Sequence, residues 1–250
     1  MALLARAILC CIGVSALVWA GMFAPSFWAC ASLNGLAAQI VRSENSSAVP
    51  LEQALPVIEA LERSDACRPQ AMHDAAIIRG RLVQIAFDNS DPDAIRSSMA
   101  AANAMIRKSL SCAPADAFMW FALFWIESMR FGLSERTIGY LEKSYELGPY
   151  EGWVALKRNR YALLAYKELP PRLQARMVKE FAALVNSGFI VETTATLMGA
   201  GWPFHDTLLA GLADTREKYK KQLATNLRRA GVEVAVPGVT MPEWRPWQVD

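Results

Sequence analysis

The sequence has little histidine and lacks the common metal-binding and catalytic motifs. His73 and His205 are its only histidines, and they lie far apart, outside any His-Glu-x-x-His pattern and away from a cysteine pair. The chain also lacks a P-loop, a G-x-S-x-G motif and a dinucleotide fingerprint. We therefore predict no metal, no cofactor and no enzymatic activity, and we interpret both histidines as surface or capping residues.

The chain also lacks a dominant sign of charge. Its 26 basic and 24 acidic side chains leave a formal net charge of +2. A nucleic-acid-binding protein would carry a dense basic face, so we exclude nucleic acid as a partner. Hydrophobic residues make up 53% of the 250 residues, which is enough for one or two domains with a sizeable core.

Charge is absent from residues 7–41, and this absence indicates a membrane segment. Its most apolar part, residues 7–24, is about long enough to cross a bilayer, and Arg6 precedes it. We therefore predict one N-terminal transmembrane helix within residues 1–30. The positive-inside rule places the N-terminus in the cytoplasm and the main domain on the periplasmic side of the inner membrane.

A cleaved signal peptide is the alternative interpretation of this segment. Ala29 and Ala31 form an A-x-A cleavage pattern. We favour a retained anchor because the apolar stretch is long and because Phe23, Phe27 and Trp28 are typical of an aromatic belt at a membrane surface.

Helical periodicity dominates the chain after a polar linker over residues 31–50. We expect an all-α domain of antiparallel helical hairpins over residues 51–230. The tail over residues 231–250 has prolines, tryptophans and no helical period, so we expect it to be extended. The helices expected from periodicity, capping residues and prolines are residues 51–63, 70–87, 93–110, 115–131, 134–147, 150–166, 172–185, 190–198 and 207–229.

The most regular hairpin lies between Cys112 and Pro149. Its first helix is apolar on every side, which is typical of a buried helix. Five residues match the tetratricopeptide pattern: the terminal Pro149, the second-helix positions Ser144 and Leu141, and the first-helix positions Phe121 and Phe124. The unit therefore resembles a tetratricopeptide repeat, although Trp125 and Ser128 depart from it. The resemblance implies a short tetratricopeptide-like solenoid over residues 70–187.

Cys67 and Cys112 form the informative cysteine pair. Each stands two residues before a proline, so we assign them to equivalent places in successive units. In an oxidising compartment a disulfide between them would join two hairpins. Against it, equivalent points on neighbouring repeats lie about 9 Å apart, which is beyond the reach of a disulfide. The sequence leaves bridged and unbridged cysteines both open.

A basic and aromatic run provides the candidate binding residues. Trp153, Arg158, Arg160 and Tyr161 lie, with Lys157, on the first helix of the third unit. The resemblance implies that this helix lines a concave groove. Arginine and aromatic side chains there would bind an acidic peptide or the carboxylates and sugar rings of an acidic polysaccharide. The alternative is a solvated helix face whose long side chains cover the core.

Glu127 is the single candidate for catalysis. Glu127-Ser128 resembles the Glu-Ser pair that opens the catalytic motif of lytic transglycosylases, in which the glutamate is a general acid. The Gly-Leu-Met-Gln run that should follow is missing. The alternative is a helix-end carboxylate that pairs with Arg130 or reaches solvent.

These observations favour a non-enzymatic, membrane-anchored scaffold of the cell envelope. We expect it to bind other envelope proteins and to act in the assembly or export of a surface polysaccharide. The alternatives are a cell-wall or polysaccharide-cleaving enzyme that uses Glu127, and an accessory subunit of a larger membrane complex. In the accessory subunit the small residues Cys10, Cys11, Gly13 and Ser15 would form a helix contact.

Overall fold

The computed structural model describes residues 2–42 and 49–240; within these ranges, the side chains of residues 2–5, 7–8, 22–29 and 49–50 lie outside the description. Contacts divide the chain into two compact units, an N-terminal unit, Met1–Glu127, and a C-terminal unit, Ser128–Asp250. The boundary falls within α5, so the repeat domain expected over residues 51–230 extends into both units.

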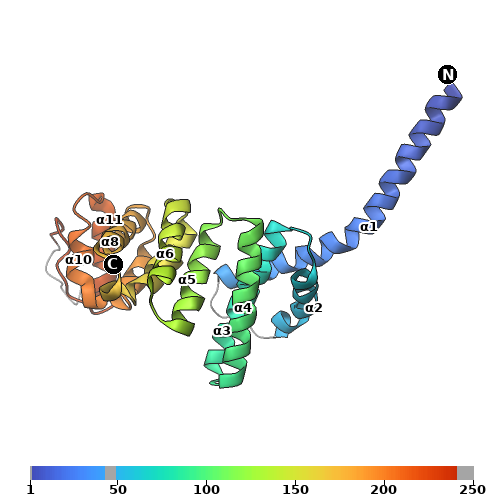
Figure 1. Ribbon diagram of the computed structural model, residues 1–250. Helices are drawn as coiled ribbons and strands as arrows, with labels where there is room; N and C mark the ends of the chain where they lie inside the picture. Colours follow the sequence, from blue (N-terminus) through green and yellow to red (C-terminus); the bar gives the residue numbers. More distant parts are fainter. Residues whose placement is uncertain (1, 43–48, 241–250) are drawn as a thin grey trace. The chain divides into compact units, whose positions relative to one another are not determined.

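The order of the elements along the chain is shown in Figure 1. The N-terminal unit holds α1 (Ala2–Arg42), α2 (Val49–Arg63), α3 (Pro69–Asp88), α4 (Pro92–Cys112) and most of α5 (Ala117–Phe131). The C-terminal unit holds α6 (Glu135–Leu147), α7 (Gly152–Leu163), α8 (Pro171–Asn186), α9 (Ile190–Met198), α10 (His205–Ala210) and α11 (Glu217–Arg229), with the short 3-10 turns η1 (Tyr166–Glu168) and η2 (Trp202–Phe204).

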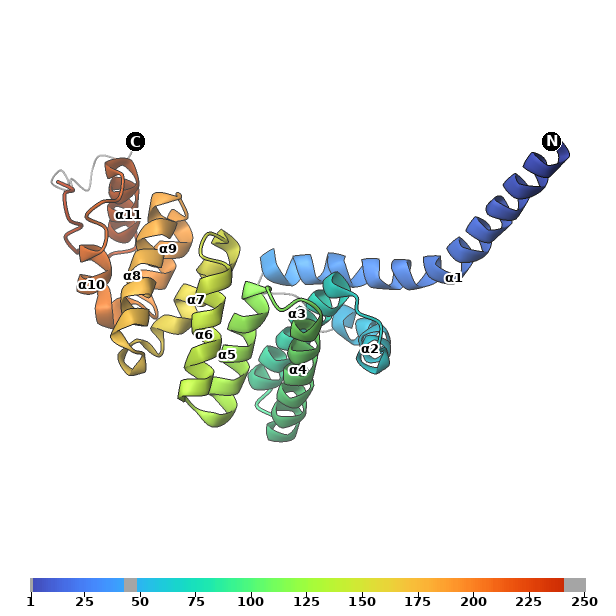
Figure 2. The ribbon, with the colours of Figure 1, turned by 45° about the horizontal axis from the view of Figure 1, so that its top comes forward.

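The hairpin of α3 and α4 forms the centre of the N-terminal unit (Figure 2). Asp91 starts α4 because its carboxylate accepts hydrogen bonds from the backbone N–H groups of Asp93 and Ala94. Apolar side chains at helical spacing then fill the hairpin's interior. Those that are at most 1% exposed are Met72, Ala75, Ile78, Val83, Ala102, Met105 and Ile106.

Polar contacts hold α2 against this hairpin. Lys108 on α4 donates hydrogen bonds of 2.6 Å to the carbonyls of Glu62 and Ser64, and so satisfies carbonyls at the C-terminal end of α2. Arg79 on α3 binds the two carboxylate oxygens of Glu62 at 2.9 and 3.0 Å. The end of α2 is therefore tied to both helices of the hairpin.

The first helix is longer than we expected. We predicted a polar linker over residues 31–50, but α1 continues to Arg42. Leu33 and Ala37 are 0% and 2% exposed, and α1 packs against α2 and α3. The linker prediction is wrong for residues 31–42 because side chains spaced by one helical turn bury themselves against those helices. Residues 43–48 lie outside the described part of the chain.

The other end of α1 projects away from the rest of its unit (Figures 1 and 2). Large apolar side chains on this arm are between 56% and 74% exposed: Leu9, Ile12, Val14, Leu17, Val18 and Trp19. Among the residues that the structure describes, no helix combines the length and apolarity that crossing a membrane requires. The predicted aromatic belt of Phe23, Phe27 and Trp28 lies outside the side chains that the structure describes.

The C-terminal unit packs α8 against α7, α9, α10 and α11. Met177 and Phe181 of α8, Leu197 of α9 and Leu223 of α11 are all fully buried and form its core. These apolar residues come from helices far apart in the sequence, so the unit depends on tertiary packing rather than on any single hairpin.

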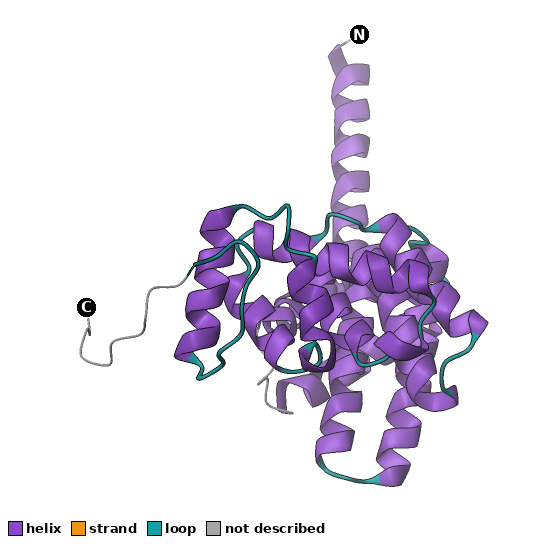
Figure 3. Cartoon of the chain, turned by 90° about the vertical axis from the view of Figure 1, so that its left-hand side faces the viewer, coloured by secondary structure: helices purple, strands orange, loops and turns teal. Residues whose placement is uncertain are grey.

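The all-α prediction is confirmed, since the described residues form helices and loops without a strand (Figure 3). The helix predicted over residues 190–198 is α9. The single helix predicted over residues 207–229 is wrong. The chain instead forms α10 and α11, and the turn between them begins at Gly211, where a Cβ would lie 2.4 Å from Val178 Cγ1.

Candidate binding surface

Helix α7 presents a mixed basic and aromatic face to solvent, which we call the α7 surface. Its residues recur every three or four positions, with one adjacent pair, so they share one side of the helix. They are Trp153, Lys157, Arg160, Tyr161 and, just after the helix end, Leu164. Trp153 is 39% and Leu164 is 70% exposed, whereas Lys157 and Tyr161 are half-buried.

The start of α7 is positioned by a close helix contact. A Cβ at Gly152 would lie 3.2 Å from the ring of Phe189, a contact tighter than most, so glycine at this position eases the approach of Phe189. Tyr150, two residues earlier, is 97% exposed. Tyr150 and Trp153 therefore place two aromatic rings near the start of the α7 surface.

Arg158, which we predicted to bind a ligand, lies on the opposite face of α7 and is fully buried. Its guanidinium binds Glu180 through Nε, at 3.1 Å, and through Nη2. It also donates to the Ser144 carbonyl at 2.7 Å, the Ser144 hydroxyl at 2.9 Å and the Gly148 carbonyl at 3.1 Å. These five hydrogen bonds equal the five N–H donors of a guanidinium. The binding prediction for Arg158 is therefore wrong, because the side chain is enclosed and occupied.

The buried ion pair perturbs the ionisable groups around it. Burial raises the pKa of Glu180, while Arg158 and hydrogen bonds oppose this change. Burial also raises the pKa of Tyr145 well above its ordinary value, and the negative charge of Glu180 adds to this effect. The Arg158 guanidinium lies 4.1 Å from the centroid of the Tyr145 ring. The cluster joins α6, α7 and α8, which indicates a structural role.

Helical spacing contains a clue to the position of Arg158 that our sequence interpretation missed. Val154, Arg158 and Ala162 are four residues apart, so they line one side of α7, and Val154 and Ala162 are fully buried. Glu180 likewise lies in the apolar stripe of α8, between Met177 and Leu184. Two opposite charges on facing apolar stripes indicate a buried pair.

A hollow of about 390 Å³ adjoins the C-terminal end of the α7 surface. We call it the α7 hollow, and it is lined by Leu163, Leu164, Lys167, Glu168, Gly199, Ala200, Pro203 and Phe204. The Lys167 ammonium lies 5.9 Å from the centroid of the Phe204 ring. The centroids of the Phe204 and Tyr166 rings lie 4.4 Å apart. Cations next to aromatic rings suit a ligand that carries both carboxylates and flat apolar faces.

Glu127, the catalytic candidate, is 6% exposed and bonded by two residues of α4. Its Oε1 accepts hydrogen bonds from Asn103, at 2.6 Å, and from Arg107, at 2.7 Å. Arg107 also bonds Asn103, at 2.9 Å, so the three side chains form a closed network between α4 and α5. Glu127 does not line the α7 hollow. The arrangement supports our alternative of a structural carboxylate, and Arg107 is a cationic partner that the sequence did not indicate.

Cys67 and Cys112 form a disulfide, with sulfur atoms 2.07 Å apart and Cα atoms 5.6 Å apart. Cys67 precedes α3, and Cys112 is the last residue of α4. Because α3 and α4 form a hairpin, the start of one helix lies beside the end of the other. Our assignment of the two cysteines to equivalent places in successive repeats is therefore wrong: the bridge closes a single hairpin.

His73 has a hydrogen-bonding partner that sequence reasoning did not find. Its Nδ1 lies 2.6 Å from Oδ2 of Asp116, and both side chains are mostly buried. Asp116 also accepts a hydrogen bond from the backbone N–H of Met119 and so caps α5. The residues are far apart in the sequence, and nothing in their local pattern indicates the pairing. No group of three or more potential metal ligands occurs among the described residues.

Comparison of the chain with protein-family models, with curated proteins and with solved structures gives no match.

Proposed function

We propose that the protein is a non-enzymatic, membrane-anchored scaffold of the cell envelope. The single observation that carries this proposal is the exposed apolar arm of α1. An arm with Leu9, Leu17 and Trp19 turned to solvent is unfavourable in water, because burying each such side chain is worth about 1.5–3 kcal/mol. A lipid bilayer would supply that apolar environment.

The length of the arm is compatible with an anchor. At about 1.5 Å per residue, residues 7–24 extend for about 27 Å, close to the ~30 Å of a hydrocarbon core. No membrane-crossing helix is found among the described residues, but the side chains of residues 7–8 and 22–24, which belong to the proposed anchor, lie outside that description. The disulfide between Cys67 and Cys112 supports an oxidising compartment for the main domain, as on the periplasmic side of the inner membrane.

The helical body is proposed to be the part that binds partners. The proposal includes a tetratricopeptide-like stacking of its hairpins, with other envelope proteins as partners. The α7 surface is the best candidate for the contact, because Arg160 and Trp153 combine a cation with an aromatic ring. The same chemistry suits an acidic polysaccharide, and this supports a role in polymer assembly or export.

Membrane extraction with alkaline carbonate tests the anchor. The wild-type chain should stay in the membrane pellet, and Leu17→Arg should release it, because a central arginine costs about 2.5–3.5 kcal/mol in a membrane helix. Val191→Arg is the matched control, since Val191 on α9 is 71% exposed and Leu17 is 74% exposed. Release of the wild type, or equal release of both variants, contradicts the anchor.

Site-specific photocrosslinking tests the α7 surface in native membranes. A photoreactive residue at Leu164 should give a discrete protein adduct that Arg160→Ala weakens. The same residue at Val191, which is similarly exposed, should not give that adduct. Retention on immobilised alginate, compared with neutral dextran, tests the polysaccharide. The α7 surface binds neither a protein partner nor an acidic polysaccharide if two results occur together. The crosslinker gives the same adducts at both positions, or none, and the chain is retained equally on both polymers.

A further inference from the structure

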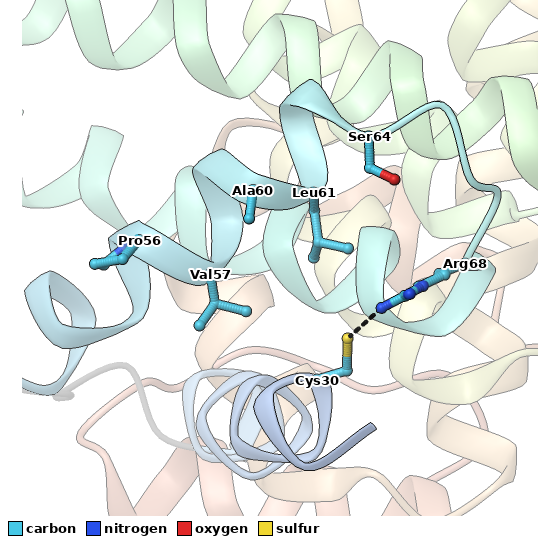
Figure 4. Close-up of a pocket in the computed structure, with 7 residues that line it drawn as sticks. All are labelled: Cys30, Pro56, Val57, Ala60, Leu61, Ser64 and Arg68. Carbon is cyan, nitrogen blue, oxygen red and sulfur yellow. Dashed lines mark hydrogen bonds between the residues drawn. The ribbon is translucent and has the colours of Figure 1, made fainter. Parts of the chain in front are cut away.

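A second hollow, of about 400 Å³, lies in the N-terminal unit between α1, α2 and the start of α3 (Figure 4). We call it the α2 hollow. Its lining residues are Cys30, Pro56, Val57, Ala60, Leu61, Ser64 and Arg68. Its volume falls at the lower end of the range for small-molecule sites, so it has room for part of a ligand about the size of a lipid headgroup and the first carbons of a chain.

The lining of the α2 hollow is amphipathic. Pro56 and Ala60 are exposed and Val57 is half-buried, so α2 turns an apolar strip toward the opening. Arg68 is the one charged residue among the seven that line the hollow. A ligand that fills the hollow would therefore meet an apolar wall along α2 and a cation at the start of α3.

The guanidinium of Arg68 is available to an anion. Among the described residues its hydrogen-bond contact is with the sulfur of Cys30, at 3.7 Å, and a thiol is a weak acceptor. Figure 4 shows the guanidinium turned toward Cys30, at the side of the hollow formed by α1. Arg68 is also the residue before α3, so the positive end of the helix dipole adds to its charge. A phosphate group would bind this fork through two hydrogen bonds.

The hollow lies on the same helix as the apolar arm. Cys30 follows residue 24 by about 9 Å along α1, at ~1.5 Å per residue. Each headgroup layer of a bilayer is about 5–7 Å thick. If residues 7–24 occupy the hydrocarbon core, as proposed above, the α2 hollow lies close to the outer edge of the headgroup layer. Measured along the helix, the cation and the apolar strip are then about 2–4 Å beyond the headgroup layer, within reach of a headgroup phosphate.

We propose that the α2 hollow binds an anionic phospholipid of the membrane in which the chain is anchored. The lipid phosphate contacts Arg68, and the carbons of the headgroup and glycerol lie along Pro56, Val57 and Ala60. This inference rests on the proposed anchoring. The bound lipid would connect α1, α2 and α3 at the membrane surface and so fix the orientation of the N-terminal unit relative to the bilayer.

Native mass spectrometry of the full-length protein in detergent, titrated with phosphatidylglycerol or phosphatidylcholine, tests the proposal. We expect one retained phosphatidylglycerol and weaker retention of phosphatidylcholine. Arg68→Gln should weaken phosphatidylglycerol binding about tenfold or more, because a charged hydrogen-bonding partner is lost. Ala60→Trp should weaken it by filling the apolar strip while leaving the cation. Arg63→Gln is the matched control, because Arg63 is an exposed arginine on α2 that does not line the hollow.

Flotation of the same variants with phosphatidylcholine vesicles separates this inference from the proposed function. A wild-type chain that fails to float contradicts the anchor itself. The lipid site is overturned, and the anchor left intact, if the wild-type chain floats but Arg68→Gln and Ala60→Trp retain phosphatidylglycerol as well as Arg63→Gln does. Equal retention of both lipids by the wild type also overturns it. Circular dichroism checks that each variant keeps its helix content.

Discussion

Replacing Arg158 by methionine should open α7 and α8 to hydrogen exchange, because Glu180 would stay buried without its cation. Glu180 and Arg158 are 8% and 0% exposed. Removing one partner of a buried ion pair costs about 3–5 kcal/mol. The carbonyls of Ser144 and Gly148 would lose a donor as well. The free energy of unfolding of the C-terminal unit should therefore fall by at least about 3 kcal/mol.

Hydrogen-exchange mass spectrometry of the full-length chain measures this change locally. At a factor of ten for every ~1.4 kcal/mol, exchange in peptides from α7 and α8 should accelerate roughly a hundredfold or more. Peptides from α3, in the other unit, provide an internal reference that should exchange at the wild-type rate.

Two further variants decide whether the ion pair is the cause. Arg160→Met changes an exposed arginine on the same helix and should alter stability by no more than about 0.5 kcal/mol. Arg158→Met combined with Glu180→Leu should recover most of the loss, because an apolar pair of similar volume can replace a buried ion pair. The reasoning is refuted if Arg158→Met exchanges like Arg160→Met, or if the double variant is no more protected than the single one.

Three other substitutions test a disulfide, a buried carboxylate and a close glycine contact. Because the bridge between Cys67 and Cys112 closes a loop with a sequence separation of 45, Cys112→Ser should lower the free energy of unfolding by about 2–4 kcal/mol in urea titrations, and an unchanged midpoint would argue against it. Burial raises the pKa of Asp74, so its stabilising contribution is complete below about pH 4 and decreases as the pH rises. The stability of the wild type relative to Asp74→Asn should therefore fall as the pH rises above about 4, and a difference that grows would contradict this. Gly211→Ala should cost about 1–3 kcal/mol in thermal unfolding because its Cβ would meet Val178, and Val178→Ala should restore stability if the clash is the reason.

Helix content and most helix positions followed from local patterns in the sequence. The start of α4 follows from Asp91 and Pro92, because a capping carboxylate and a proline at the first helical position act within one turn. The helix at residues 190–198 followed from its helical surroundings in spite of its threonines. Helix starts and helix positions depend on neighbours along the chain, so they can be predicted without the tertiary structure.

Only part of the candidate site could be predicted from the sequence. Trp153, Arg160 and Tyr161 belong to the α7 surface, whereas Arg158 is buried on the other side of the same helix. The run from Lys157 to Tyr161 is polar throughout, so it does not separate its two faces by itself. The buried face is indicated only by the apolar residues four positions away, Val154 and Ala162. The choice depends on Glu180, which is brought to Arg158 by the packing of α8 on α7.

The sequence by itself determined that the chain is helical, that its N-terminal segment is apolar and uncharged, and that helical periodicity ends near Gly231. The extended tail predicted over residues 231–250 stays a prediction, because residues 241–250 lie outside the described part of the chain. Only the tertiary structure decided which polar side chains pair, as in His73 with Asp116 and Arg158 with Glu180, and that Cys67 and Cys112 close one hairpin. The physical reason is the distance along the sequence over which each interaction acts. Helix formation and apolar character depend on residues within a few positions, whereas each pairing depends on helices whose packing brings distant residues together.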